Sequence, residues 1–210
     1  MVFSNLFFLY FFLPLNLICY FLAKSIHVRN GILIVFSLFF YAWGEPRYVP
    51  LLVGMVLINW IFGLMIEKYR GQKLAKAGLI GACICSLTLL GIFKYLTLIL
   101  GTTHDLFGLP SVVPQILLPI GISFFTFQAM SYVIDVYRGA NKAQKNFGKV
   151  LLYISFFPQL IAGPIVKYHD VEQEIEHRTQ SADGVARGIR RFIAGLSKKV
   201  LISNVMGMTA

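Results

Sequence analysis

The sequence predicts an all-α, polytopic transmembrane protein. Hydrophobic residues make up 57% of the 210 positions, and charged residues make up 13%, whereas soluble domains carry about 25% charged residues. Apolar runs long enough to cross a membrane recur along the chain, since a helix needs about 20 residues to span the hydrocarbon core. Aromatic residues reach 15%, so much of the surface must be apolar, which suits contact with lipid.

Five apolar segments are predicted to cross the membrane. They are residues 3–23, 31–43, 48–66, 77–100 and 112–136. We interpret the first as a span rather than a signal peptide, because no basic residues precede it and no small-residue cleavage site follows it. The second segment is short, and it crosses only if Arg29 and Arg47 reach the interfaces from its two ends.

The distribution of basic residues predicts the orientation of these spans. Ten Lys and Arg residues fall in the loops 24–30, 67–76 and 138–149, whereas the opposite side receives Arg47 alone. The positive-inside rule therefore places those three loops in the cytoplasm and the N-terminus outside. The same rule accounts for the net charge of +10 without a nucleic-acid partner.

The next apolar stretch, residues 150–166, is predicted to be re-entrant rather than to cross. It is short and contains Pro158, Gly163 and Pro164. Irregular backbone at membrane depth requires protein or a water-filled cavity around it. A distorted crossing helix is the alternative.

Two cytoplasmic elements are predicted to follow. Residues 167–188 form a segment of mixed charge, and residues 189–200 form an amphipathic helix. The basic face of this helix consists of Arg190, Arg191, Lys198 and Lys199. Such a helix is expected to lie on the anionic cytoplasmic leaflet, unless its apolar tail begins another membrane entry.

One polar stripe interrupts the fifth apolar segment. Gln128, Tyr132 and Asp135 share one helix face at spacings i, i+4 and i+7, and polar groups facing lipid are costly. We therefore expect the stripe to face the protein interior, where it lines a passage or has a structural role. For Asp135 the alternative is an ion pair with Arg138 one turn later. Gln159 in the predicted re-entrant segment is a further candidate of the same kind.

The sequence predicts neither a complete catalytic site nor a metal site. The histidines fall in predicted loops or in the polar segment, outside every predicted span: His27, His104, His169 and His177. The three cysteines lie in apolar stretches without metal-ligand spacing, so we interpret them as small hydrophobic residues.

Several motifs resemble those of bacterial membrane-bound O-acyltransferases of the alginate O-acetyltransferase type. They are LPIGISFFTFQAMSYVIDVYRG at 118–139, FFPQLIAGPIV at 156–166, the opening MVFS with FYAW at 40–43, and GLSKK at 195–199. The resemblance runs from the first residue to the last. It implies the N-terminal portion of a ring of helices around a thin centre, located in the bacterial inner membrane.

The resemblance also implies a reaction. It is acetyl transfer from a cytoplasmic donor, acetyl-CoA or an acyl carrier, to hydroxyls of an exported, alginate-like polysaccharide, with no bound cofactor. The catalytic histidine is expected beyond residue 210, so the chain alone is expected to be inactive. The basic helix face is expected to suit the anionic donor, and other polysaccharide-modification proteins are expected partners.

Three alternatives stay open from the sequence. The first is D-alanyl transfer to teichoic acid by a related family. The second is a transporter or channel component in which Asp135 and Gln128 line the path. The third is a non-catalytic membrane partner that assembles with a separately encoded second half.

Overall fold

The computed structural model describes residues 5–107, 118–160 and 163–203. Within these ranges every regular element is a helix, which confirms the predicted all-α class. Three of these helices are long and apolar enough to cross a membrane: Ile26–Gly44, Pro46–Lys68 and Lys73–Leu96. A shorter apolar helix runs from Phe8 to Leu22. The chain is therefore an all-α membrane protein.

The chain divides into two compact units. Unit 1 comprises Met1–Ile32 and Gln173–Ala210, and unit 2 comprises Leu33–Glu172. The elements in chain order are η1 (Phe8–Phe12), α1 (Leu13–Leu22), α2 (Ile26–Gly44), η2 (Pro46–Tyr48), α3 (Val49–Lys68), α4 (Lys73–Phe107), α5 (Ile122–Arg138), α6 (Phe147–Ser155), α7 (Phe157–Leu160), α8 (Tyr168–Glu176), α9 (Ala182–Lys198) and η3 (Lys199–Ser203). Helices α2 and α8 each contribute residues to both units.

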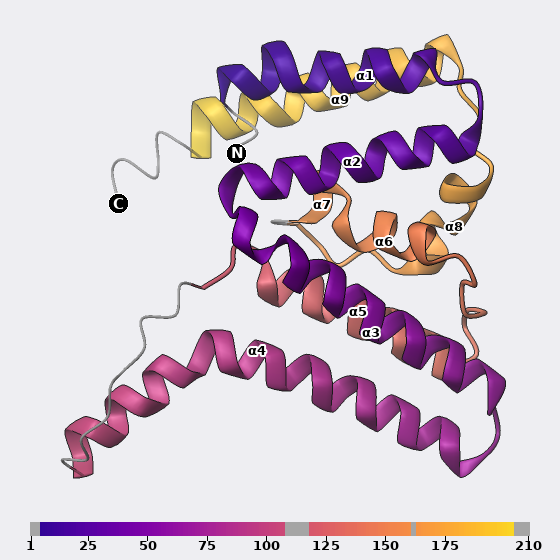
Figure 1. Cartoon of the computed structure of the whole chain (residues 1–210). Helices are drawn as coiled ribbons and strands as arrows, with labels where there is room; N and C mark the ends of the chain where they lie inside the picture. The colour runs from indigo at the N-terminus through magenta and orange to yellow at the C-terminus, as the bar shows by residue number, and fades with distance from the viewer. Residues whose placement is uncertain (1–4, 108–117, 161–162, 204–210) are drawn as a thin grey trace. The chain divides into compact units, whose positions relative to one another are not determined.

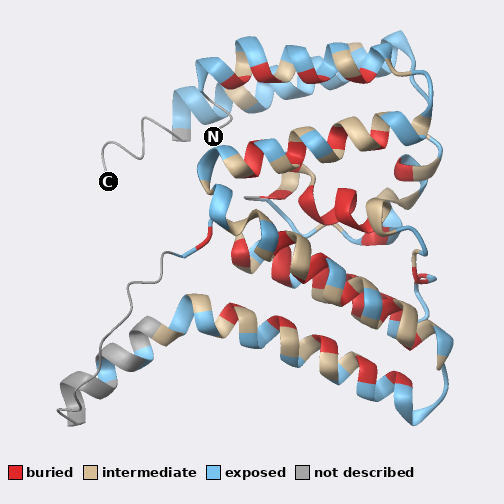
Figure 2. Cartoon of the chain, viewed as in Figure 1, coloured by how far each residue is buried: buried red, intermediate tan, exposed pale blue. Residues whose placement is uncertain are grey.

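Helix α3 is the centre of unit 2. It packs against α4 and α5, which also contact each other, and against α6 (Figure 1). Its interior face includes Leu52, Met55 and Ile66, all fully buried. Burial in this unit is greatest on α3, α5 and α6 (Figure 2). Ile80, Ile84 and Leu87 on α4 are exposed, as expected for side chains that face lipid.

The helices extend past the apolar runs that predict them. Helix α2 begins at Ile26 rather than at residue 31, and α4 covers 73–107 rather than 77–100. An apolar run marks the part of a helix that suits lipid, whereas the helical backbone continues through polar residues that do not interrupt its hydrogen bonds. The hydroxyl of Ser25 accepts the N–H of His27 at 3.3 Å, which satisfies a donor at the start of α2.

The fifth predicted segment, 112–136, begins as a helix only at Ile122. Gly121 precedes it with φ of 76°, a left-handed conformation that favours glycine and interrupts a right-handed helix. Residues 112–117 of this prediction lie outside the described ranges, as do residues 3 and 4 of the first predicted span. The first span otherwise corresponds to η1 and α1.

The predicted boundaries after residue 166 are wrong. The segment 167–188 contains α8, and α9 begins at Ala182 instead of residue 189. The hydroxyl of Ser181 accepts the N–H of Gly184 at 3.1 Å, so this serine is the N-cap of α9. The prediction relied on the apolar face, which begins later than the helix because Asp183 and Gly184 occupy its first turn.

Candidate functional site

The polar stripe of α5 lies in the interior of unit 2. The exposed fractions of Gln128, Tyr132 and Asp135 are 4%, 0% and 7%. These residues share their face with Phe125, Ala129 and Val136, which are also buried. The structure thus brings the three predicted site residues together on one buried helix face.

Helix α5 ends directly after this stripe. Gly139 has φ of 79°, and the N–H of Ala140 donates to the carbonyl of Asp135 at 3.0 Å. The N–H of Gly139 donates to the carbonyl of Val136 at 3.1 Å. This pair of bonds is a Schellman motif, which satisfies carbonyls that the helix end would otherwise leave without partners. The chain then enters the connection 139–146.

Side chains from α3 and the turn after it hold this connection in place. The indole N–H of Trp60 donates to the carbonyl of Gln144 at 2.8 Å, and the carboxylate of Glu67 accepts the N–H of Ala143. The guanidinium of Arg70 donates to the carbonyl of Val136 at 3.0 Å. The ends of α3 and α5 that carry the basic loops therefore lie together.

Three buried tyrosines from α5, α6 and α8 form the centre of the site, which we call the tyrosine cluster. Its members, Tyr132, Tyr153 and Tyr168, are at most 1% exposed. The ring of Tyr168 lies edge-on to both others, with centroid distances of 5.4 Å to Tyr132 and 5.2 Å to Tyr153. Edge-to-face pairs at this distance stabilise beyond the area that they bury.

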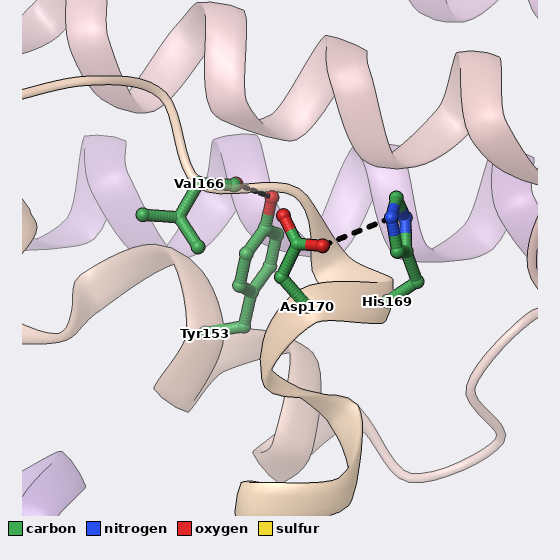
Figure 3. Close-up of polar contacts among 4 residues, drawn as sticks. All are labelled: Tyr153, Val166, His169 and Asp170. Atoms are coloured by element: carbon green, nitrogen blue, oxygen red, sulfur yellow. Dashed lines mark hydrogen bonds and ion pairs between the residues drawn. The ribbon is translucent and has the colours of Figure 1, made fainter.

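Each hydroxyl of the tyrosine cluster has a hydrogen-bond partner. The backbone N–H of Gln144 donates to the Tyr132 hydroxyl at 2.9 Å, and its side-chain amide donates to the Tyr168 hydroxyl at 3.0 Å. The Tyr153 hydroxyl donates to the carbonyl of Val166 at 2.6 Å (Figure 3). The cluster thereby links α5 and α6 to the chain that leads into α8.

The predicted re-entrant segment is broken in the structure at Phe156. Helix α6 ends at Ser155, and Phe156 adopts φ of −55° and ψ of 113° before the short α7. The side-chain amides of Gln128 and Gln159 both donate to the carbonyl of Tyr153, the former at 3.0 Å. The hydroxyl of Ser37 accepts the N–H of Phe157 at 3.2 Å. Side chains thus replace backbone bonds that a continuous helix would have made.

The glycine and prolines of this segment are exposed. Gly163 has φ of 128°, a conformation that side-chain-bearing residues rarely adopt, which explains the glycine at this position. Pro158 lies in the first turn of α7, and Pro164 lies outside any helix. Residues 161–162 lie outside the described ranges.

Asp135 differs from the other members of the stripe. Its Oδ2 atom is buried and has no hydrogen-bond partner within the described residues. The pairing with Arg138 that the sequence left open is not formed: no ion pair joins these two described residues, and Arg138 is exposed. A buried carboxylate without a partner is costly, so Asp135 is the member of the stripe with unmet bonding capacity.

The basic residues of α9 lie in unit 1 and are exposed. They are Arg190, Arg191, Lys198 and Lys199. The apolar side chains of the same helix, Ile189, Phe192 and Ile193, are exposed as well. In the described part of the chain, α9 therefore presents both an apolar and a basic face.

Sequence reasoning missed several residues of the buried polar network. Gln144, Tyr153 and Tyr168 carry no periodic signal, because their partners lie on other elements. Asn59 and Ser86 were detectable as polar residues inside predicted spans. Both are fully buried, and the Asn59 amide donates to the Ser86 hydroxyl at 3.1 Å between α3 and α4.

No group of three or more metal-ligating side chains could hold a metal ion among the described residues. His27 and His104 lie within α2 and α4 rather than in loops. His169 lies in the first turn of α8, where its Nε2 is 3.0 Å from a carboxylate oxygen of Asp170 (Figure 3). Both of these side chains are about half exposed, so they form no enclosed site.

The chain is similar along its whole length to curated O-acetylases. It is 38% identical over 215 residues to a probable alginate O-acetylase of Pseudomonas aeruginosa, which covers 100% of this chain and 41% of the relative. It is 29% identical over 236 residues to a peptidoglycan O-acetyltransferase of Helicobacter pylori, covering 97% of this chain and 45% of that protein. The chain belongs to the alginate O-acetylase type of membrane-bound O-acyltransferases.

The matched relatives are longer than this chain, and a related transferase matches only part of it. The chain spans about two fifths of the length of the curated relatives it matches. A teichoic acid D-alanyltransferase of Bacillus subtilis is 30% identical over 86 residues, which cover 40% of this chain and 22% of that protein. The D-alanyl alternative is therefore the weaker one. No family model and no solved structure matches the chain.

Proposed function

We propose that this chain forms one part of an enzyme that transfers acetyl groups to hydroxyls of an exported, alginate-like polysaccharide. The observation that carries the proposal is the similarity to curated O-acetylases over the whole chain. Because the chain spans about two fifths of those relatives, its contribution is a scaffold that the remaining part completes. The relatives are transferases, which favours this function over a transporter or channel component.

The contacts of the site divide its residues into two roles. Gln128, Gln159 and Tyr132 bond backbone groups, so their polar atoms stabilise the broken segment and the connection after α5. The role of these three residues is therefore structural. Asp135 has an oxygen with no partner in the described part of the chain, so it is the residue of the stripe that can meet a substrate or a polar group from the remaining part. A general base in the remaining part would accept the proton of the acceptor hydroxyl.

The proposed membrane placement follows from the charge distribution. The protein lies in the bacterial inner membrane with its N-terminus outside and the basic loops in the cytoplasm. The Glu67 carboxylate accepts a hydrogen bond from the connection after α5, and Arg70 donates one to the end of α5. These bonds support a common side for two of the loops. The basic face of α9 would then meet an anionic acyl donor, either acetyl-CoA or an acyl carrier.

Co-expression tests the proposal. The chain and the remaining part of the Pseudomonas aeruginosa relative are produced as separate polypeptides in a strain that exports unacetylated alginate. We expect the two to co-purify and ester-linked acetyl groups to return to the polysaccharide. The chain alone and the remaining part alone are the controls, and both are expected to give none. Stable co-purification without any acetylation would count against the proposed function.

A further inference from the structure

Two arginines distant in sequence converge on one aromatic ring in unit 1. The guanidinium carbons of Arg29 and Arg178 each lie 5.4 Å from the centroid of the Tyr20 ring. Tyr20 is buried, and both arginines are half-buried. Stacking on an aromatic face at this distance holds a guanidinium in position. Both guanidinium groups thus lie against the same ring, and the charge of Arg29 acts on Arg178.

Further hydrogen bonds orient this group, which we call the arginine pair. The amide of Asn30 donates to the carbonyl of Ile175 at 2.9 Å, and its oxygen accepts a bond from Arg178. The amide of Gln180 donates to the Tyr20 hydroxyl at 2.6 Å. The Nε of Arg29 donates to the carbonyl of Ala23 at 2.8 Å. Arg29 is therefore held through its Nε atom, and Arg178 is held by the side chains of Asn30 and Tyr20.

No carboxylate of the described residues forms an ion pair with either arginine. Tyr20 and the Glu174 carboxylate favour the charged form of Arg178 without forming such a pair. Burial lowers the pKa of the Arg178 guanidinium, and the nearby charge of Arg29 lowers it further. The Nε atom of Arg178 is buried and has no hydrogen-bond partner among the described residues. Two half-buried like charges and an unmet donor are unfavourable unless an anion joins them.

We infer that the arginine pair, Arg29 with Arg178 at Tyr20, binds a phosphate group. A guanidinium presents several N–H donors in a planar fork that matches two phosphate oxygens, and two such forks suit a dianion. The pair also lies close to the start of α2, whose positive end adds to the attraction. The phosphate could belong to a lipid headgroup or to a soluble molecule. This site does not depend on the acetyl-transfer reaction.

The test uses the intact chain in lipid nanodiscs with two kinds of probe. In the first arm, inorganic phosphate replaces chloride at constant ionic strength in phosphatidylcholine nanodiscs, and ³¹P NMR line broadening measures binding. In the second arm, the nanodiscs contain phosphatidylglycerol, and native mass spectrometry counts the phospholipids that remain on the chain. Saturable binding in the first arm identifies a soluble phosphate source. A retained phosphatidylglycerol in the second arm identifies a lipid source.

Matched variants separate the site from general positive charge. Arg178→Gln and Arg29→Gln are each expected to weaken binding about tenfold or more, as loss of a charge-assisted hydrogen bond does. Arg187→Gln removes an exposed arginine from the same unit and is expected to leave binding unchanged. Circular dichroism checks that each variant keeps its helix content. Arg178→Lys keeps the charge but loses the fork, so it too should weaken binding.

Two results would overturn the inference. One is the absence of saturable binding by the unmodified chain in both arms, which needs no variant to interpret. The other is an equal loss of binding in Arg178→Gln and Arg187→Gln, since this would mean that diffuse charge attracts the anion. Failure of acetylation in the co-expression experiment would leave this site unaffected, so the two proposals fail separately.

Discussion

A substitution of Gly63 by alanine tests the packing of the tyrosine cluster. A Cβ atom at position 63 of α3 would lie 3.0 Å from Cε1 and 3.4 Å from the hydroxyl oxygen of Tyr132. The first distance is shorter than ordinary van der Waals contact. The Tyr132 ring cannot readily move away, because Gln144 bonds its hydroxyl and Tyr168 packs edge-on against it. The added methyl group must therefore strain the cluster.

Gly54 in the same helix provides the matched control. A Cβ atom there would meet no heavy atom within 4 Å. Alanine in place of a helical glycine stabilises by about 0.5–1 kcal/mol through backbone entropy alone. Gly54→Ala is expected to show this gain in full. Gly63→Ala has the same gain but is opposed by overpacking of about 1–3 kcal/mol, so its net effect is expected to be destabilising by up to about 2.5 kcal/mol.

Both variants are compared by their free energy of unfolding in mixed micelles. Circular dichroism follows the unfolding during a titration with a denaturing detergent. Truncation of the tyrosine in a Gly63→Ala/Tyr132→Ala double variant should remove the strain, so the two single effects should not add. Equal changes in Gly63→Ala and Gly54→Ala would refute the close approach of α3 to Tyr132. Additivity in the double variant would refute the assignment of the strain to that ring.

Three further predictions concern other buried contacts. Asn59→Leu should destabilise the folded chain by about 0.6–1.7 kcal/mol in the same titration, because it removes the hydrogen bond to the Ser86 hydroxyl. An unchanged free energy of unfolding would contradict that bond. Arg70→Gln should speed amide hydrogen exchange in the connection after α5, whereas unchanged exchange would show that Arg70 does not hold it. Asp135→Asn should leave the free energy of unfolding unchanged or raise it, because the buried Oδ2 atom has no partner among the described residues. The same variant should lower acetylation in the co-expression experiment, and destabilisation would reveal a partner for the carboxylate.

Helical periodicity was sufficient to predict which face of α5 is polar. The spacing of Gln128, Tyr132 and Asp135 depends on one element, and the high cost of polar groups in lipid decides where that face points. Helix ends were predicted less well, because hydropathy reports the solvent around a helix rather than its hydrogen bonds. Ser25 and Ser181 accept hydrogen bonds at the starts of α2 and α9, and a hydropathy pattern does not contain this information.

Contacts between elements could not be predicted from local pattern. The prolines and glycine of 150–166 indicated an irregular backbone, but the break lies at Phe156, ahead of Pro158. The residues that satisfy this break come from α2, α5 and α7, so no single segment contains the signal. Gln144 is a similar case: it lies in a polar connection, yet it bonds two members of the tyrosine cluster.

The central proposal is that this chain supplies the scaffold of a polysaccharide O-acetyltransferase. The most direct test is a single-chain chimera in which these 210 residues replace the matching segment of the Pseudomonas aeruginosa relative. The acetyl content of the exported alginate is measured by ¹H NMR in a strain that lacks its own acetylase. We predict acetyl signals in the polysaccharide, and their reduction when Asp135 in the chimera is changed to asparagine. A chimera that inserts into the membrane at normal abundance and yields unacetylated alginate would contradict the claim.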